Sequence, residues 1–163
     1  KAQADGVQYR TAEMRAASDD MVVEGYAAVF NSTTDLGVFQ ERIAPGAFAD
    51  VLDDDVRLLI NHDGVPLART SNGTLTLKED EDGLYYRGVL SNTQAGRDLY
   101  TMIKRGDISQ SSFAFTIRDE SVDEDGVRVI EKVDRLIDVS PVTYPAYQAA
   151  TVSARAEVKK END

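Results

Sequence analysis

The chain has 163 residues, of which 42% are hydrophobic, and its 29 acidic and 18 basic side chains give a net charge of −11. This length and composition suit one compact domain with a single core. The negative charge repels a phosphate backbone, so we expect no binding to nucleic acid or to an anionic membrane. No apolar run approaches the roughly 18 residues that span a bilayer, and residues 1–20 lack an apolar signal core, so we expect neither membrane insertion nor classical secretion.

Cysteine is absent, and His62 is the only histidine. The lack of thiols excludes disulfides, thiol nucleophiles and thiolate zinc sites. One imidazole cannot build a histidine-rich metal cage or a catalytic arrangement that needs two histidines. Any imidazole chemistry of this chain therefore belongs to His62, and we expect no cofactor and no bound metal.

The first 20 residues mix Ala, Asp, Arg and Glu without sustained periodicity, which predicts a flexible arm able to add one edge strand. Short segments rich in β-branched and aromatic residues follow and predict a mainly β domain. These segments are residues 21–30, 38–43, 56–60, 74–78, 84–90, 111–118 and 127–137. Two acidic stretches that contain glycine, 79–83 and 123–126, lie between them and predict hairpin turns.

Two helices are predicted to flank the strands. Segment 45–52 begins with Pro45 in a first-turn position, and segment 93–105 gathers its apolar residues on one face before Gly106 ends it. The charged segment 155–163 predicts a solvated tail.

The predicted fold is mainly β with flanking helices (α+β), in the form of a small, mostly antiparallel β-barrel. We expect the barrel to be closed or nearly closed, because exposed strand edges favour aggregation. The chain would then divide into an arm at 1–20, one domain at 21–154 and the tail at 155–163.

The lone histidine lies in the sequence Asn-His-Asp-Gly, directly after the apolar run 57–60. His62 is therefore expected where a buried strand leaves the core, a position at which the strand fixes the backbone and the side chain stays accessible. A single histidine at a strand end is more often an ordinary turn residue. The catalytic interpretation needs a partner for it.

Three serines in segment 109–112 enter a predicted strand, whose alternation separates their directions. Ser111 shares a face with Phe113 and Phe115, whereas Ser112 shares the other face with Ala114. If the phenylalanines fill the core, Ser112 points away from it beside small neighbours. Since a serine hydroxyl needs an imidazole to take its proton, Ser112 is the candidate nucleophile and His62 its candidate base.

A third group must hold the imidazole in the correct tautomer, and it cannot be a second histidine. Asp138 ends another apolar strand and is the candidate for this role. Asp63 is the poorer choice because neighbouring strand side chains point apart, and a water molecule is the remaining alternative.

Acidic clusters offer two further interpretations, both weaker. Clusters 53–55, 79–82 and 123–125 contain oxygen ligands for calcium or magnesium, but aligning Gly126 with the glycine of an EF-hand puts Ser121 first and Lys132 last, where carboxylates are needed. The sequence Asp-Leu-Gly at 35–37 lacks the hydroxyl residue of an aspartic peptidase turn. We therefore expect solvated hairpins here.

Several segments, in their order and spacing, resemble the prohead protease family of tailed phages, which is similar in fold to the herpesvirus assemblins. The resemblance extends over residues 25–153. It is carried by GYAAVF at 25–30, ERIAPGAF at 41–48, NHD at 61–63, GDI at 106–108, SFAF at 112–115, DVSPVT at 138–143 and PAY at 145–147.

The resemblance implies that Ser112 and His62 form the catalytic pair. Before Val-Ser-Pro-Val-Thr the family usually has glutamate, where this chain has the shorter Asp138, and the assemblins use a second histidine in the third role, which this chain lacks. The implied activity is that of a serine endopeptidase which cleaves the scaffold segment of a major capsid protein, and itself, inside the assembling prohead in the host cytoplasm. Portal and other prohead proteins are further implied partners, and a homodimer is the implied assembly. The rival hypothesis is a non-catalytic β-barrel that serves as a scaffolding or docking module within the particle.

Overall fold

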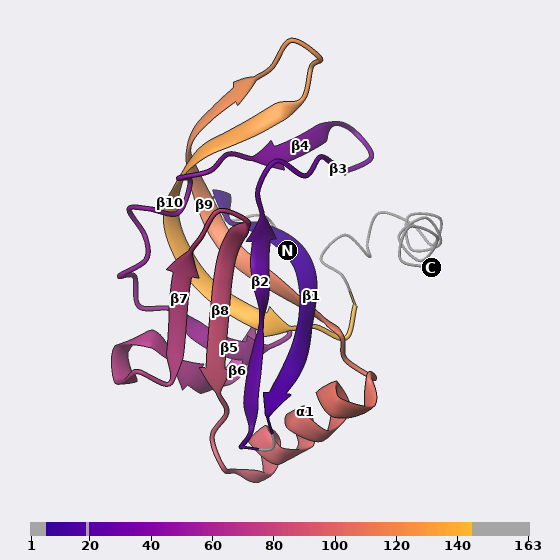
Figure 1. Ribbon diagram of the computed structural model, residues 1–163, viewed down its shortest axis with the longest axis vertical. Helices are drawn as coiled ribbons and strands as arrows, with labels where there is room; N and C mark the ends of the chain where they lie inside the picture. The colour runs from indigo at the N-terminus through magenta and orange to yellow at the C-terminus, as the bar shows by residue number, and fades with distance from the viewer. Residues whose placement is uncertain (1–5, 19, 145–163) are drawn as a thin grey trace.

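The β-rich segments join into one curled sheet in the computed structural model, which describes residues 6–18 and 20–144 (Figure 1). Ten strands of this described part follow the order β3-β4-β10-β9-β1-β2-β8-β7, with β5 paired to β10 and β6 paired to β5. Their bounds are β1 Gln8–Ser18, β2 Val22–Val29, β3 Thr34–Asp35, β4 Gln40–Ile43, β5 Arg57–Ile60, β6 Asp63–Arg69, β7 Leu75–Glu79, β8 Gly83–Val89, β9 Gln110–Val122 and β10 Arg128–Pro141.

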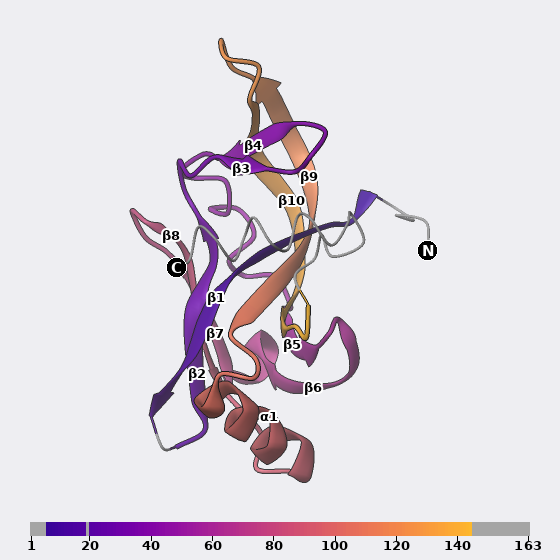
Figure 2. The ribbon, with the colours of Figure 1, turned by 90° about the vertical axis from the view of Figure 1, so that its right-hand side faces the viewer.

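The sheet bends around one apolar core and forms a half-barrel. Figures 1 and 2 show the hairpin of β9 and β10 at one end of the molecule and the helix at the other. Among the described residues the hydrogen-bonded order ends at β3 and β7, so the barrel is not closed by strand pairing. Inside the curled sheet, Leu58 of β5 packs against Gly88 of β8. The largest fully buried side chains are Tyr86, Phe48, Phe113, Phe115, Leu58, Leu75, Leu84 and Leu99.

The mainly β prediction is confirmed, and the neighbours are mostly antiparallel. The exceptions within the described chain are the parallel pairs that β10 makes with β4 and β5. The two acidic hairpin turns are also confirmed, since residues 79–83 connect β7 with β8 and residues 123–126 connect β9 with β10.

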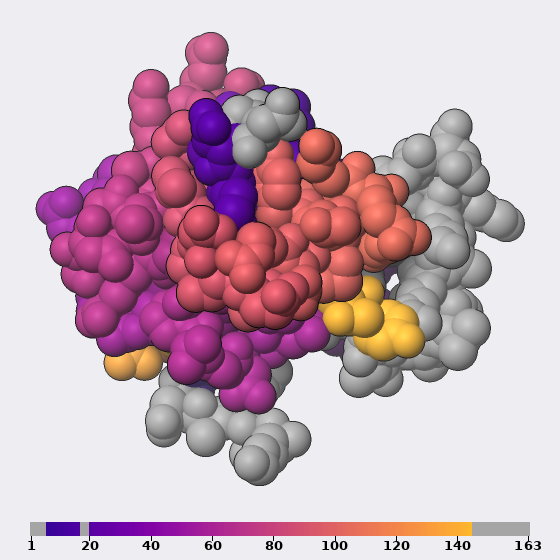
Figure 3. Space-filling model, turned by 90° about the horizontal axis from the view of Figure 1, so that it is seen from below, coloured from indigo at the N-terminus to yellow at the C-terminus, as the bar shows by residue number. Residues whose placement is uncertain are grey.

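One α-helix, α1 Gln94–Arg105, lies within the described residues and matches the second predicted helix. The Thr93 side chain caps its start by accepting a hydrogen bond from the Gly96 amide, and Gly106 ends it in the left-handed conformation at φ 88°. Leu99 and Ile103 bury its apolar face. Figure 3 shows α1 from below, covering this end of the half-barrel.

The predicted helix at 45–52 is wrong, because this segment forms consecutive turns. Gly46 has φ +86°, which no right-handed helix can accommodate, and it follows Pro45 directly. The backbone hydrogen bonds of segment 45–52 join residues three positions apart, as in a turn. Val51 N, for example, donates to Phe48 O at 3.0 Å. The Glu79 carboxylate holds the start of the segment by accepting from Gly46 N and from Phe48 N.

Residues 8–18, expected to be a flexible arm, form β1 between β9 and β2. The first half of β1 pairs with β9 and the second half with β2. A buried ion pair joins β1 to β4, with Arg10 Nη2 2.8 Å from Glu41 Oε1. β6 was likewise not predicted. The division of the chain into arm, domain and tail remains a prediction, and 155–163 lie outside the described residues.

Candidate active site

His62 occupies the tight turn between β5 and β6. Ile60 and Asp63 pair across this hairpin, so Asn61 and His62 form a two-residue loop, with φ of 53° and 59°. Positive φ at both central residues is the signature of a type I′ turn, and asparagine and histidine are among the non-glycine residues that adopt positive φ most often. For a non-glycine residue this conformation still costs free energy, which contacts with the surroundings must offset.

Contacts with the end of β10 hold this turn in place. The Asn61 amide N–H donates to Pro141 O at 3.0 Å. The Asn61 side chain donates from Nδ2 to Thr143 Oγ1 at 3.1 Å and accepts at Oδ1 from Thr143 N at 2.9 Å. The backbone that carries His62 is therefore positioned by residues about 80 positions away along the chain.

The alternation predicted for β9 is confirmed. Phe113 and Phe115 are fully buried in the core, and Ser111 Oγ accepts a hydrogen bond of 2.8 Å from the buried hydroxyl of Tyr86. Ser112 and Ala114 therefore lie on the other face of the sheet. Ser112 differs from the expectation in one respect, because its side chain is fully buried and not open to solvent.

A β-bulge in β10 brings Asp138 to the face of Ser112. Leu136 lies opposite Phe115 and Asp138 lies opposite Ala114, so Ile137 is an extra residue in β10. Regular alternation would place Asp138 on the same face as Leu136, which is in the core. Bulges of this kind redirect side chains beside functional sites.

The imidazole of His62 lies between Asp138 and Tyr9. Its Nδ1 is 2.5 Å from Asp138 Oδ1, and the ring centroids of Tyr9 and His62 are 4.6 Å apart in an edge-to-face arrangement. Tyr9 and Asp138 flank Ala114 on its two sides in the strand register. The ring therefore crosses β9 at Ala114, whose small side chain leaves room for it.

Two polar atoms at this place have no hydrogen-bond partner. His62 Nε2 and Ser112 Oγ are both buried, and neither has a partner in the structure, so they are not hydrogen-bonded to each other. An unsatisfied pair of this kind requires an explanation, because most buried polar atoms are paired. Catalytic hydrogen bonds are often absent or long before substrate binds.

This arrangement can perform base catalysis on a hydroxyl. When Nδ1 carries the proton and donates a hydrogen bond to the Asp138 carboxylate, Nε2 carries the lone pair and can accept a proton from Ser112. Asp63, the alternative partner, is exposed at the first position of β6, and the contact to Nδ1 comes from Asp138.

The acidic clusters do not assemble an ion site. Among residues 6–18 and 20–144 no group of three or more histidine, aspartate or glutamate side chains is arranged to hold a metal. Asp80 and Asp123 instead accept hydrogen bonds from backbone amides of their own turns. No helix in this described part has the length and apolar character to cross a membrane.

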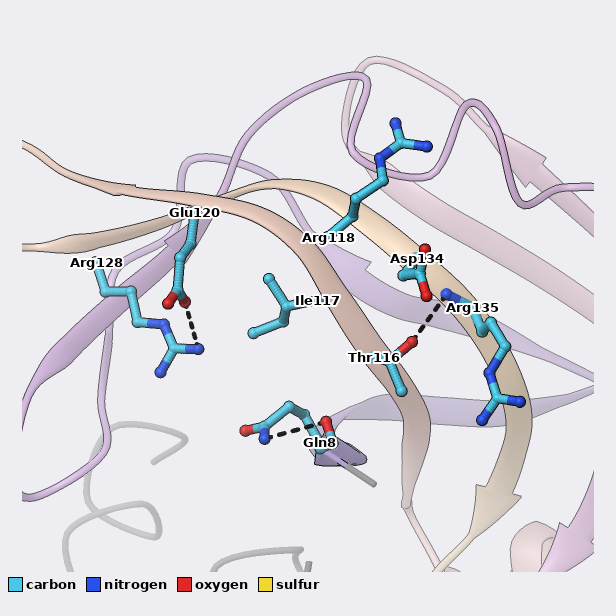
Figure 4. A pocket seen from close by; sticks show the side chains of 9 residues that line it. Gln8, Thr116, Ile117, Arg118, Glu120, Arg128, Asp134 and Arg135 are labelled. Atoms are coloured by element: carbon cyan, nitrogen blue, oxygen red, sulfur yellow. Dashed lines mark hydrogen bonds and ion pairs between the residues drawn. The ribbon is translucent and has the colours of Figure 1, made fainter. Parts of the chain in front are cut away.

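Two of the cavities formed by residues 6–18 and 20–144 lie close to the sheet, and neither of these two is lined by Ser112, His62 or Asp138. The first has a volume of about 660 Å³ (Figure 4). It adjoins the part of β9 that follows Phe115, the last residue of β9 to pair with β1. There Arg128 pairs with Glu120 at 2.5 Å. The second, of about 610 Å³, includes Thr11, the β1 residue opposite Ser112. The arginines of the first cavity are Arg118, Arg128 and Arg135.

A serine, a histidine and an aspartate gathered on one face of a curled β half-barrel define a candidate hydrolase site. The chain belongs to the family of caudovirus prohead serine proteases, whose model matches residues 7–163. It is 31% identical over 144 residues to the prohead protease of Enterobacteria phage HK97, a match that covers 84% of this chain and 61% of that relative. The chain thus spans about three fifths of the length of this curated relative.

A solved structure has the same fold. The capsid assembly protease of bacteriophage T4 matches with a TM-score of 0.54 and 12% identity, over 85% of this chain and 98% of the T4 chain. At this identity the likeness concerns the arrangement of the strands and not the chemistry of the site.

Sequence reasoning missed three residues that contact the site. Asn61 and Ser140 lie within the segments that carry the family resemblance, NHD and DVSPVT, and that position was the only available signal for them. Tyr9 lies in the predicted arm, where no local pattern indicated a contact with His62. The structure brings all three together with His62 and Asp138.

Proposed function

We propose that this chain is a serine endopeptidase with Ser112 as nucleophile, His62 as general base and Asp138 as the residue that orients the imidazole. One observation favours Ser112 over the two other buried serines near it as the nucleophile. Ser111 accepts from Tyr86 in the core, and Ser140 donates to Asp138, whereas Ser112 Oγ has no partner. It shares a face with an imidazole nitrogen that also has none.

The proposed reaction follows from these contacts. His62 Nε2 takes the hydroxyl proton as Ser112 Oγ attacks the scissile carbonyl carbon, and the Asp138 carboxylate stabilises the imidazolium that forms. The C–N bond then breaks, and the imidazolium gives its proton to the leaving amine. A water molecule, deprotonated by the same nitrogen, hydrolyses the acyl-serine ester and restores the hydroxyl.

The proposed substrate follows from the names of the relatives, a prohead protease and a capsid assembly protease. In this proposal the enzyme cleaves the scaffold segment of a major capsid protein, and also itself, within the assembling prohead in the host cell. Portal and other prohead proteins are further proposed partners, and the proposed assembly is a homodimer.

Co-expression with the capsid protein tests this proposal, with cleavage followed by intact-mass spectrometry. Ser112→Ala and His62→Ala are expected to lower cleavage by roughly 10³-fold or more while remaining folded by circular dichroism. Ser121→Ala is the matched control, because it removes an exposed hydroxyl from the same strand.

Three outcomes are informative. Loss of cleavage in both site variants, with activity kept in Ser121→Ala, supports the Ser-His peptidase. Undiminished cleavage in Ser112→Ala removes Ser112 as nucleophile. An inert wild-type protein favours the rival interpretation, a scaffolding or docking module.

A further inference from the structure

A second side chain holds the carboxylate that contacts His62. Ser140 Oγ donates a hydrogen bond of 2.8 Å to Asp138 Oδ1, which is the oxygen that lies 2.5 Å from His62 Nδ1. Ser140 is fully buried, at 0% exposure, and Asp138 is 5% exposed. One carboxylate oxygen therefore serves two donors inside the protein.

The strand register explains how Ser140 reaches this place. It lies two residues after Asp138 in β10, so the two side chains share a face, and it stands directly opposite Ser112 in β9. The bulge at Ile137 turns this whole end of β10, and it therefore delivers Asp138 and Ser140 to the site together.

Ser140 restricts how the Asp138 carboxylate can turn. A terminal carboxylate rotates in a broad torsional well, and a single contact to His62 would not fix it. A second donor on the same oxygen, from the same strand, selects the orientation in which that oxygen faces Nδ1. Charge-assisted hydrogen bonds inside a protein are strong enough for such a task.

We propose that Ser140 is a positioning residue, which fixes the Asp138 carboxylate so that His62 keeps the ring orientation and tautomer that the reaction needs. The expected effect of Ser140 on the reaction rate rests on the proposed function. Its structural consequence, the order of the contact between His62 and Asp138, does not depend on any substrate.

The kinetic test compares Ser140→Ala and Ser140→Thr with wild type on the capsid substrate. Loss of a hydrogen bond to a charged group predicts a fall in kcat of about 10- to 100-fold for Ser140→Ala. KM should stay unchanged, and Ser140→Thr, which keeps the hydroxyl, should recover most of the rate. Equal losses in the two variants, or a loss in KM alone, would overturn the proposal.

The matched control is Ser111→Ala. Ser111 is equally buried and lies opposite Pro141, but its hydroxyl bonds Tyr86 on the core face. It should lose thermal stability without a comparable fall in kcat. A kcat loss equal to that of Ser140→Ala would show that burial alone explains the effect.

A spectroscopic test needs no substrate. Because His62 is the only histidine, a protein labelled with ¹⁵N-histidine reports one imidazole. A far-downfield Nδ1 proton is expected in wild type, lost in Ser140→Ala, kept in Ser140→Thr and in Ser111→Ala, and absent in Asp138→Asn. An unchanged signal in Ser140→Ala would contradict the proposal.

The two readouts separate the hypotheses. A signal that depends on Ser140 in a protein that cleaves nothing would refute the proposed function and keep the positioning role. Activity that survives Ser140→Ala at full rate would refute the positioning role and keep the peptidase. If Ser140→Ala does not fold, Ser140→Cys, which keeps the size but donates weakly, takes its place in both tests.

Discussion

Two turns of the same sheet are built in opposite ways. In the turn between β9 and β10, Asp123 Oδ1 accepts from the amides of Asp125 at 2.9 Å and Val127 at 3.0 Å, and Gly126 supplies the positive φ of 79°. Every one of these contacts lies within four residues. The turn that carries His62 has no glycine at its two positive-φ positions and depends on residues of β10 and beyond it.

This difference distinguishes a turn that only connects two strands from a turn that presents a side chain to the candidate site. A turn whose amide N–H groups are hydrogen-bonded within the turn does not need contacts with distant residues to form. Its other side chains can therefore be polar and exposed to solvent. The turn with Asn61 and His62 adopts its shape because Pro141, Thr143 and Asp138 hold it. Its conformation is thus specified by the same strand end that provides the carboxylate.

Among substitutions outside the proposed triad, loss of the hydrogen bonds between Asn61 and Thr143, which clamp the His62 turn, should have the largest effect. Asn61→Gly keeps a residue that tolerates positive φ but deletes both side-chain bonds to Thr143. A displacement of the imidazole by about 1 Å would lower kcat by roughly 100-fold. Cleavage rates of the proposed capsid substrate measure this, and the circular dichroism spectrum should be unchanged.

Asn61→Ala is the companion variant for this prediction. It loses the same bonds and also places a Cβ in the left-handed region, so its thermal stability should be lower than that of Asn61→Gly. If Asn61→Gly keeps the wild-type kcat, the clamp to Thr143 does not position His62.

A smaller effect is expected from Tyr9, which packs edge-on against the imidazole. Loss of an aromatic pair is worth about 0.5–1.5 kcal/mol, so Tyr9→Ala should lower kcat by roughly 2- to 10-fold. Tyr9→Phe keeps the ring and should retain the rate. Steady-state kinetics measure both, and equal losses in the two variants would assign the effect to the hydroxyl instead of to the packing.

The smallest effect is expected in the turn between β9 and β10. The amide N–H groups, first that of Val127, together with the Arg42 guanidinium 3.6 Å away, hold the pKa of Asp123 below its ordinary value of 3.8. A carboxyl whose pKa is lowered on folding adds stability above its unfolded pKa and loses it as the pH falls through the folded value. Asp123→Ala should therefore lower Tm slightly at neutral pH, and this difference should shrink as the pH falls through the lowered pKa of the folded state.

Asp123→Ala should change thermal stability but not activity. Asp123→Ala should cleave the proposed capsid substrate at the wild-type rate, because the turn lies far from the site along β9 and β10. Asp125→Ala, which removes a neighbouring carboxylate that accepts none of these amide bonds, should show no such pH-dependent shift in Tm. A Tm difference that persists in acid would contradict the assigned cause.

Local patterns were sufficient for much of the fold. The predicted segments match β2, β4, β5, β7, β8, β9 and β10, since β-branched residues and acidic glycine turns act over a few positions. Helix α1 was also predictable, because Thr93 and Gly106 mark its ends. The face of Ser112 followed from the alternation with Phe113.

Long-range contacts account for what could not be predicted. β1 looks polar in sequence, and its place in the sheet depends on β9 and on the ion pair from Arg10 to Glu41. The helix expected after Pro45 fails at Gly46, whose φ no composition rule gives. Alternation along β10 would assign Asp138 to the core face, and only the paired register with β9 shows the extra residue at Ile137.

The two faces of β9 and β10 have a consequence for how this molecule loses order. Phe113 and Val139 pack in the core, while Ser112 and Ser140, their immediate neighbours, line the site. Local unfolding that exposed the site residues would have to detach the core residues between them. The proposed nucleophile and positioning residue therefore belong to the same cooperative unit as the core, and heat should remove their order in the transition that melts the core.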